Sequence, residues 1–377
     1  FAAFTMMLNS SPLMRIHSFA MFNNNDSKRS ERQNITAGSP SDGPGNPARR
    51  RILSTGLTGL GAAAVAVAGP TILGRDAADA QPSDAQPSDV QPSANAGSQK
   101  ELSGKTAFIT GGARGIGLAC GEVLAAKGAN IALFDIAEPN VPNVQYPLAS
   151  ERDLSQAKAR IEALGVRCLT FKGDVRDLEA QKRAVERTVD EFGSLDIVVA
   201  NAGVSQAGTI KEFSSDDIST VFEINVGGVI KTTQAAAPFM QRQNGGRIIY
   251  ISSALGRMGN ELFPIYTPTK WAVIGFAKSA AVTYGKSNIL CNVVAPGLVD
   301  TPLADNLTVL RTLMPDTNNP TFDAVAEAGL ASSPLNVAHL EVEDVAHAVA
   351  FFAGEGTSKV SGEVFDVSYG SLSRSIA

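Results

Sequence analysis

Seven short, mostly apolar runs recur along the later part of the chain, and stretches long enough to form helices separate them. The runs lie at 106–110, 130–134, 167–171, 196–200, 247–251, 290–294 and 363–367. Continuous apolar strands that alternate with helices are typical of a parallel sheet covered on both faces. The pattern therefore predicts an α/β fold over residues 100–377, a single doubly wound Rossmann domain with about seven parallel strands and helices on both faces.

The first 99 residues lack this alternation. Residues 1–48 are rich in Asn, Ser, Pro and Gly, which predicts a disordered region. In residues 49–80, three arginines precede a run of Gly, Ala, Val and Leu, and the small-residue pattern Ala-Asp-Ala follows at the end. This order is typical of a twin-arginine export signal. Residues 81–99 repeat Gln-Pro-Ser and predict a flexible linker.

The apolar run at 56–73 is interrupted by Pro70 and is too rich in Gly and Ala to predict a stable membrane span. We therefore expect export to the periplasm rather than membrane integration. Two alternatives stay open. The segment could be a weak anchor or a basic tail, or the protein could be cytoplasmic with a misassigned start, for which Met21 is a convenient candidate.

Composition excludes several classes of function. The chain is 44% hydrophobic and 18% charged with a net charge of −5, as expected of a globular protein. Residues 100–377 hold 24 Lys and Arg against 30 Asp and Glu without a basic block, so nucleic acid is not an expected partner. The cysteines, Cys120, Cys168 and Cys291, are far apart and predict small core residues. The three histidines lie far from every motif, so neither a metal site nor a His-based triad is expected.

The segment TAFITGGARGIG places glycines where a predicted strand turns into a helix. Gly111, Gly115 and Gly117 would allow a tight turn and a close approach of a pyrophosphate to the free N–H groups of the helix start. Asp135 ends the second predicted strand, where a carboxylate accepts the ribose hydroxyls of NAD and repels the 2′-phosphate of NADP. Arg114 would instead attract that phosphate. Because the Asp135 charge lies next to the 2′ position, we predict NAD as the cofactor and leave NADP open.

Several motifs together resemble those of the short-chain dehydrogenases/reductases, and the resemblance covers essentially all of residues 100–377. Besides the Gly-rich loop, the shared elements are GDV at 173–175, NAG at 201–203, Asn225, Ser253, YTPTK at 266–270, PG at 296–297 and Thr301. The resemblance implies that Asp174 binds the adenine amino group and Val175 packs beside it. It implies that 201–203 support the ribose and that Pro296, Gly297, Val299 and Thr301 line the nicotinamide. The predicted cofactor-binding residues are Gly111, Arg114, Gly115, Ile116, Gly117, Asp135, Asp174, Val175, Asn201, Ala202, Gly203, Tyr266, Lys270, Pro296, Gly297, Val299 and Thr301.

The same resemblance assigns the chemistry to Asn225, Ser253, Tyr266 and Lys270. Tyr266 and Lys270 are four residues apart and share one helix face, provided that the helix begins near Pro268. We expect the Lys270 ammonium and the nicotinamide to lower the tyrosine pKa, so that Tyr266 acts as general acid and base. Ser253 would hold the substrate oxygen, with Ser252 as the alternative assignment. Asn225 would hold a water that relays protons from Lys270.

Within this family, the chain is most similar to the carveol-dehydrogenase-type, mycofactocin-associated subgroup. The likeness lies in the insert IAEPNVPNVQYPLASERDL at 136–154 and in the segment 310–329. It implies an NAD that does not exchange and a separate redox carrier as electron acceptor. Ile116 departs from the subgroup, where a glutamine is expected, and the export leader is also unusual. Homotetramers are common in the family.

The region 302–340 predicts an apolar pocket for a hydrophobic, terpenoid-like secondary alcohol or ketone. The residues that suggest it are Leu303, Leu307, Leu310, Leu313, Met314 and Phe322. The same spacing is also that of an ordinary packing helix. Two other functions stay open: an NADPH-dependent 3-oxoacyl or carbonyl reductase, and a non-catalytic redox sensor that binds a dinucleotide.

Overall fold

A parallel seven-stranded sheet forms the centre of the part of the chain that the computed structural model describes, residues 100–373. The strands are β1 (Thr106–Thr110), β2 (Asn130–Asp135), β3 (Cys168–Lys172), β4 (Ile197–Ala200), β5 (Gly246–Ile251), β6 (Ile289–Pro296) and β7 (Val364–Val367). Their order across the sheet is β3-β2-β1-β4-β5-β6-β7. All seven predicted strands are confirmed, with ends displaced by at most two residues. The predicted Rossmann fold is confirmed.

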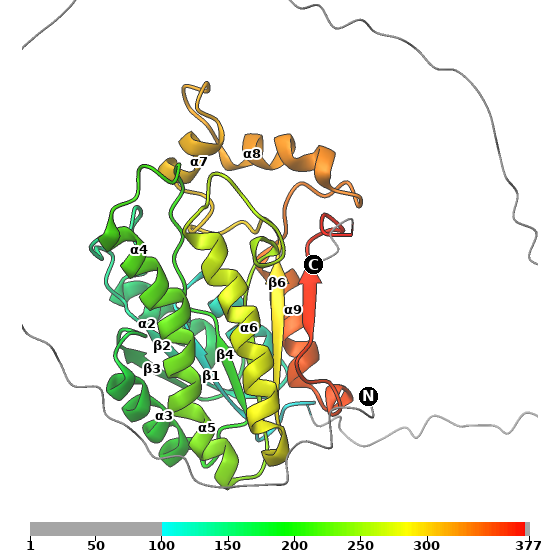
Figure 1. Cartoon of the computed structure of the whole chain (residues 1–377). Coiled ribbons are helices and arrows are strands. Elements are labelled where there is room, and N and C mark those ends of the chain that lie inside the picture. Colours follow the sequence, from blue (N-terminus) through cyan, green and yellow to red (C-terminus); the bar gives the residue numbers. More distant parts are fainter. Residues whose placement is uncertain (1–99, 374–377) are drawn as a thin grey trace, which may run out of the picture. The chain divides into compact units, whose positions relative to one another are not determined.

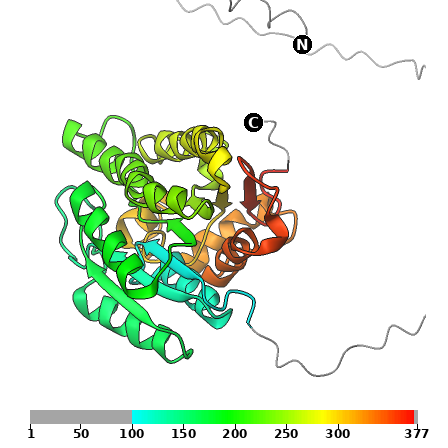
Figure 2. The same ribbon diagram turned by 90° about the horizontal axis from the view of Figure 1, so that it is seen from below.

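Two helical layers cover the sheet (Figure 1; Figure 2). The first contains α1 (Gly115–Ala126), α2 (Glu151–Glu162) and α9 (Val342–Ala353), and the second contains α3 (Leu178–Phe192), α4 (Ser215–Phe222), α5 (Val229–Arg242) and α6 (Tyr266–Tyr284). The short helices α7 (Leu307–Leu313) and α8 (Phe322–Gly329) lie beyond the carboxyl ends of the strands (Figure 1). The segments predicted at 1–48, 49–80 and 81–99 lie outside the described residues.

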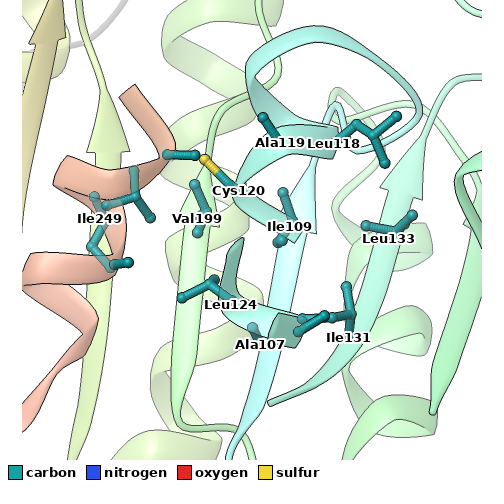
Figure 3. Close-up of a cluster of buried hydrophobic side chains, with 14 of the residues drawn as sticks. Ala107, Ile109, Leu118, Ala119, Cys120, Leu124, Ile131, Leu133, Val199 and Ile249 are labelled. Carbon is teal, nitrogen blue, oxygen red and sulfur yellow. The ribbon is translucent and has the colours of Figure 1, made fainter. Parts of the chain in front are cut away.

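The core under the first layer consists of side chains of the sheet and of α1 (Figure 3). Ile109 and Leu133 from β1 and β2 pack against Leu124 of α1, and all three are fully buried. Cys120 belongs to the same cluster, and Cys168 and Cys291 are also buried free thiols, as predicted. Burial of these apolar faces fixes α1 on the sheet, and thereby the position of the glycine-rich loop that precedes it.

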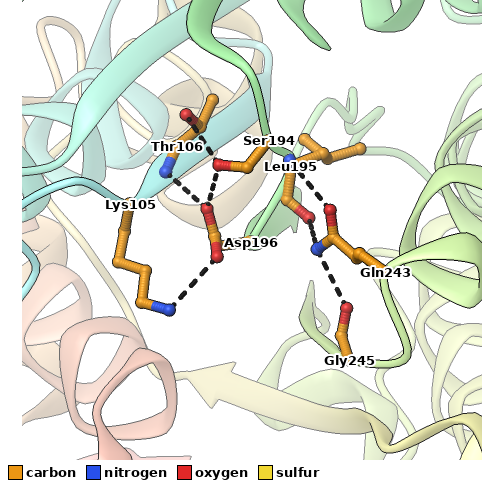
Figure 4. Close-up of polar contacts among 7 residues, drawn as sticks. All are labelled: Lys105, Thr106, Ser194, Leu195, Asp196, Gln243 and Gly245. Atoms are coloured by element: carbon orange, nitrogen blue, oxygen red, sulfur yellow. Dashed lines mark hydrogen bonds and ion pairs between the residues drawn. The ribbon is translucent and has the colours of Figure 1, made fainter.

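Polar contacts fix the end of the sheet at which the strands begin (Figure 4). The Asp196 carboxylate accepts hydrogen bonds from the Thr106 amide at 3.0 Å and from the Lys105 amine at 3.3 Å. The Gln243 side chain donates to the Leu195 carbonyl at 2.6 Å and accepts from the Leu195 amide at 3.4 Å. These contacts set the register of β1 against β4, the two strands between which the strand order reverses. In such sheets, ligands bind in the crevice at this switch point.

Helix α6 begins at Tyr266, so Pro268 lies in its first turn. The first amide groups of a helix have no intrahelical acceptor, and a proline there costs little. The predicted condition for a shared face of Tyr266 and Lys270 is therefore met. Within residues 100–373, no helix is both long and apolar enough to cross a membrane, and the run at 56–73 lies outside this range.

Candidate active site

A cavity of about 530 Å³ opens above the carboxyl ends of the strands, at the switch point of the sheet. Every predicted cofactor residue except Gly117 lines it, and so does Ser253. The fold thus brings together side chains from β2, the loops after β1, β3, β4, β5 and β6, and the start of α6. This convergence is what a dinucleotide and its substrate require of one crevice.

The glycine-rich loop forms the floor of the cavity. Gly111 and Gly115 have φ values of +65° and +56°, which glycine adopts without strain. A Cβ on Gly117 would lie 2.1 Å from the Gly111 carbonyl oxygen, so this glycine permits the turn rather than touching a ligand. Within the described residues, no side chain caps α1, which begins at Gly115. Its first N–H groups therefore suit an anion such as a pyrophosphate.

Asp135 lies at the end of β2, 7% exposed, and lines the cavity. Its carboxylate accepts hydrogen bonds from the amides of Ala113 and Ala137, each at 3.0 Å. Burial raises the pKa of this carboxyl, and the two amides together with Arg114 oppose that rise. A carboxylate held in this way keeps lone pairs for ribose hydroxyls. The Arg114 guanidinium donates to the Pro147 carbonyl at 2.6 Å, so the insert after β2 holds it in place.

Two of the predicted cofactor residues have polar partners within the protein. The Asp174 carboxylate forms a two-pronged ion pair with Arg176, at 2.6 Å in its shorter contact, instead of standing free for an adenine amino group. The Asn201 amide donates to the carbonyls of Thr110 and Gly111 at 2.9 and 3.1 Å. Asn201 therefore braces the glycine-rich loop. Both positions line the cavity, but their polar groups are largely committed within the protein.

Tyr266 is the first residue of α6, and its buried side chain lines the cavity. Ser253 lies near the tyrosine hydroxyl, and its side chain lowers the pKa of Tyr266. The Ser252 hydroxyl instead donates to the Lys270 carbonyl at 2.8 Å. Adjacent residues of an extended segment face opposite sides, so the two serines have different partners. The geometry places Ser253 beside the phenol.

Lys270 is buried beneath this pair. Its amine donates to the Ile251 carbonyl at 3.0 Å and lies 5.5 Å from the centre of the Tyr266 ring. Burial lowers the pKa of Lys270 to about 8. Burial also raises the pKa of Tyr266 above its ordinary value, and this effect is larger than that of Ser253. The expected fall of the tyrosine pKa includes the charge of the nicotinamide and stays a prediction.

Asn225 occupies a π-helical turn (Glu223–Gly228) between α4 and α5 and is fully buried. Its amide exchanges two hydrogen bonds of 2.8 Å with the backbone of Val204 and donates to the Thr269 hydroxyl at 3.1 Å. It does not line the cavity. This side chain fixes the loop after β4 against α6, and its role in holding a relay water stays a prediction.

The region 302–340 contributes less to the cavity than its apolar pattern predicts. Leu303 and Leu313 line the cavity, whereas Leu307 is 59% exposed. Leu310 and Phe322 pack together with Ala326 in a small core between α7 and α8. The alternative of a packing helix is therefore correct for part of this segment, since α7 must bury one face against α8.

Tyr146, which was not among the predicted site residues, lines the cavity and is 7% exposed. It lies in residues 136–150, the connection between β2 and α2, which we call the strap. The Tyr146 hydroxyl accepts a hydrogen bond from the Ser205 amide at 3.3 Å, and Ser205 follows β4. The length of the strap marked it as unusual, but no pattern singled out this residue. Phe263 and Tyr369 also line the cavity and were missed.

Further contacts tie the strap to neighbouring segments. The Gln206 side-chain amide donates to the Asn143 carbonyl, and the Ala207 backbone amide donates to the Gln145 side chain at 3.3 Å. The Thr308 hydroxyl donates to the Gln145 carbonyl at 3.4 Å, which connects the strap to α7. Among residues 100–373, no group of His, Cys, Asp and Glu could hold a metal ion.

Comparison with known proteins agrees with this geometry. The sequence matches the short chain dehydrogenase family over residues 105–309. It is 33% identical to a (−)-trans-carveol dehydrogenase of Rhodococcus erythropolis over 272 residues, which cover 71% of this chain and 98% of that protein. An uncharacterized NAD-dependent oxidoreductase of Mycobacterium tuberculosis is 32% identical over 273 residues, covering 72% and 97%. The chain therefore belongs to the short-chain dehydrogenase family.

Solved structures extend the comparison to three dimensions. The carveol dehydrogenase of Mycobacterium avium in complex with NAD superposes with a TM-score of 0.71 at 34% identity. The match covers 73% of this chain and 100% of that one. A short chain dehydrogenase of Mycobacterium paratuberculosis bound to NAD gives a TM-score of 0.67 at 35% identity, covering 72% and 99%.

Proposed function

We propose that the protein is an NAD-dependent dehydrogenase that interconverts a hydrophobic secondary alcohol and its ketone. One observation carries this proposal: Ser253, the Tyr266 phenol and the Lys270 amine, which lies 5.5 Å from the centre of the Tyr266 ring, line the same cavity as the glycine-rich loop. A phenol, a hydroxyl and an amine meet at this place, which suits proton transfer at an alcohol oxygen. The NAD-bound relatives support the same cofactor for this chain.

Each side chain has a distinct role in the proposed reaction. Ser253 holds the substrate oxygen against Tyr266. Tyr266 accepts the hydroxyl proton when the alcohol is oxidised and donates it when the ketone is reduced. Bound NAD supplies the hydride acceptor and a positive charge. Burial holds the Tyr266 proton tightly, so the Lys270 amine has to stabilise the phenolate during oxidation.

The choice of NAD over NADP follows from Asp135. A buried carboxylate at the end of β2 repels a 2′-phosphate, and Arg114 is engaged by the Pro147 carbonyl. The experiment is a titration of purified wild type and of Asp135→Ala with both cofactors. We expect wild type to prefer NAD, and the variant to lose that preference. A native preference for NADP would instead favour the carbonyl reductase alternative.

We also propose that NAD stays bound between turnovers. The strap is anchored to Ser205, to Gln206 and to Arg114 of the glycine-rich loop, so release of the cofactor requires several of these contacts to break together. Reoxidation would then use a separate redox carrier. The test is to purify the protein without added cofactor and to measure NAD in the denatured sample.

Export through the twin-arginine route fits a cofactor that is bound before transport, because that route carries folded proteins. We propose a periplasmic location on the basis of residues 49–80. The test replaces Arg49 and Arg50 by lysine and measures the protein in envelope and cytoplasmic fractions. Equal distribution of wild type and variant would favour the cytoplasmic alternative.

A homotetramer is proposed from the exposed aromatic residues of α9 and β7. Phe351 is 57% exposed and Phe365 is 45% exposed, and their ring centres lie 6.1 Å apart. β7 is also an edge strand of the sheet. Exposed, adjacent aromatic rings beside an unpaired strand edge are typical of a surface that a second copy covers.

A further inference from the structure

Tyr146 places a second phenol in the wall of the cavity, near Tyr266. Both side chains line the cavity, and a charge on one would affect the ionisation of the other. The Tyr146 oxygen already accepts the Ser205 amide hydrogen at 3.3 Å. Its own proton has no acceptor among the contacts of residues 100–373. Tyr146 therefore has a hydrogen-bond donor to offer and lies in a cavity that can receive a ligand.

The two phenols differ in what surrounds them. Tyr266 has Ser253 near its hydroxyl and the Lys270 amine 5.5 Å from the centre of its ring. Tyr146 has neither. Burial raises the pKa of both phenols, that of Tyr146 to about 12, so Tyr146 stays neutral at physiological pH and can donate a hydrogen bond. Because Ser253 and Lys270 lie at Tyr266, the role of the base falls to that phenol.

The cavity wall offers the Tyr146 hydroxyl few polar partners. The cavity lining includes apolar residues, among them Leu148, Val204 and Phe263. The hydroxyl of Ser205 is buried as well and has no hydrogen-bond partner within the described part of the chain. Buried polar groups in proteins are nearly always satisfied, so a wall with two incompletely used hydroxyls indicates that a ligand completes it.

We infer that Tyr146 donates its hydrogen bond to a second oxygen of the substrate, separate from the oxygen that reacts at Tyr266. This inference rests on the proposed function and narrows its substrate class. The substrate is then a hydrophobic secondary alcohol that carries a further acceptor, such as an ether, a ketone or a second hydroxyl. In this assignment Tyr146 determines substrate specificity, because it binds a part of the substrate that does not react.

Isosteric substrate pairs test this inference directly. In 4-methoxycyclohexanol and 4-ethylcyclohexanol, an ether oxygen replaces a methylene group at nearly constant shape, and the 3-substituted isomers vary the position of that oxygen. We expect wild type to oxidise at least one methoxy compound with a kcat/KM about tenfold above its ethyl partner, the size of one hydrogen bond. The difference should lie mainly in KM, since the bond persists through the reaction.

The decisive variant is Tyr146→Phe, which removes one oxygen and leaves the ring. Its methoxy-to-ethyl ratio should fall to about one, whereas Tyr284→Phe, at the other end of α6, should keep the wild-type ratio. The ratio is measured within each protein, so a general loss of folded enzyme cannot imitate the effect.

Three outcomes contradict the inference in different ways. Equal rates for every pair in wild type, or an unchanged ratio in Tyr146→Phe, would show that Tyr146 recognises no second oxygen. If wild type neither binds nor oxidises any of these alcohols with NAD, the proposed function itself is wrong, and the inference falls with it.

Discussion

At the scale of single residues, desolvation controls the candidate site. Tyr266 and Lys270 are both buried, and burial moves their pKa values toward the neutral forms, upward for the phenol and downward for the amine. Without cofactor, the Tyr266 phenol is therefore protonated, and the Lys270 ammonium loses its proton more easily than a free lysine. A positive charge beside Tyr266 would oppose the effect of burial on the phenol, because charge attraction favours phenolate and desolvation disfavours it.

The Lys270 pKa gives a prediction about stability. Its native pKa of about 8 lies below the unfolded value of 10.5, so between these pH values the unfolded state binds more protons. Unfolding free energy should thus rise with pH in this window, on the order of 3 kcal/mol at about 1.4 kcal/mol per pKa unit. Lys270→Met should lack this rise. Chemical denaturation of both cofactor-free proteins at pH 7 and pH 11 measures it, and parallel pH profiles would contradict the lowered pKa.

Gly117 gives a second prediction at this scale. Gly117→Ala would place a Cβ 2.1 Å from the Gly111 oxygen and push the loop out of position. We expect at least about a tenfold loss in dinucleotide affinity, the effect of roughly one hydrogen bond at the helix start. Gly275→Ala in α6 meets no atom within 4 Å and serves as the control. Calorimetric titration with NAD compares the two, and equal affinities would show that the loop tolerates the change.

At the scale of elements, the strap joins parts of the fold that are distant in sequence. It contacts the loop after β4 through Gln206 and contacts α7 through Gln145. The strap and the segment after β6 thus hold each other over the cavity. Ordered loops of this length in compact domains commonly serve binding, and here the anchors are polar groups of the backbone and side chains.

Loosening the strap should speed the loss of cofactor. Gln206→Met keeps the side-chain length and removes the donor to the Asn143 carbonyl, so we expect dissociation of NAD to accelerate about tenfold. Gln241→Met, at an exposed position of α5, should not change it. The measurement follows release of bound NAD after dilution into NAD-free buffer. Rapid release from wild type would mean that the strap does not retain the cofactor.

The elements themselves were predictable, and the contacts between them were not. Each strand is a local apolar run, and the Gly-rich loop and the Tyr-Lys spacing are local patterns, so a sequence displays them directly. The contact of Tyr146 with Ser205 joins residues 59 positions apart, and that of Asn225 with Val204 joins residues 21 apart. Such pairs depend on how strands order in the sheet. The competition of Arg176 for Asp174 and the burial of Leu310 under α8 likewise arise only from packing.

At the scale of the whole molecule, the exposed aromatic surface predicts assembly. Phe351→Glu would place a charge beside Phe352 and Phe365, and burial of an unpaired charge at an interface is costly. We expect this variant to dissociate into smaller species in sedimentation experiments. Leu164→Glu, a partly exposed position beyond α2, is the control and should keep the wild-type size. A monomeric wild type would contradict the proposed tetramer.

The central claim is that Tyr266 transfers the proton of a secondary alcohol while NAD receives the hydride. Its most direct test is single-turnover reduction of NAD by a hydrophobic secondary alcohol in wild type and in Tyr266→Phe, at matched saturation with cofactor. Removal of one hydroxyl group should lower the rate by about 10² to 10⁴, the usual contribution of general acid–base catalysis, and leave NAD affinity unchanged. Full turnover by Tyr266→Phe with its NAD in place would contradict the account.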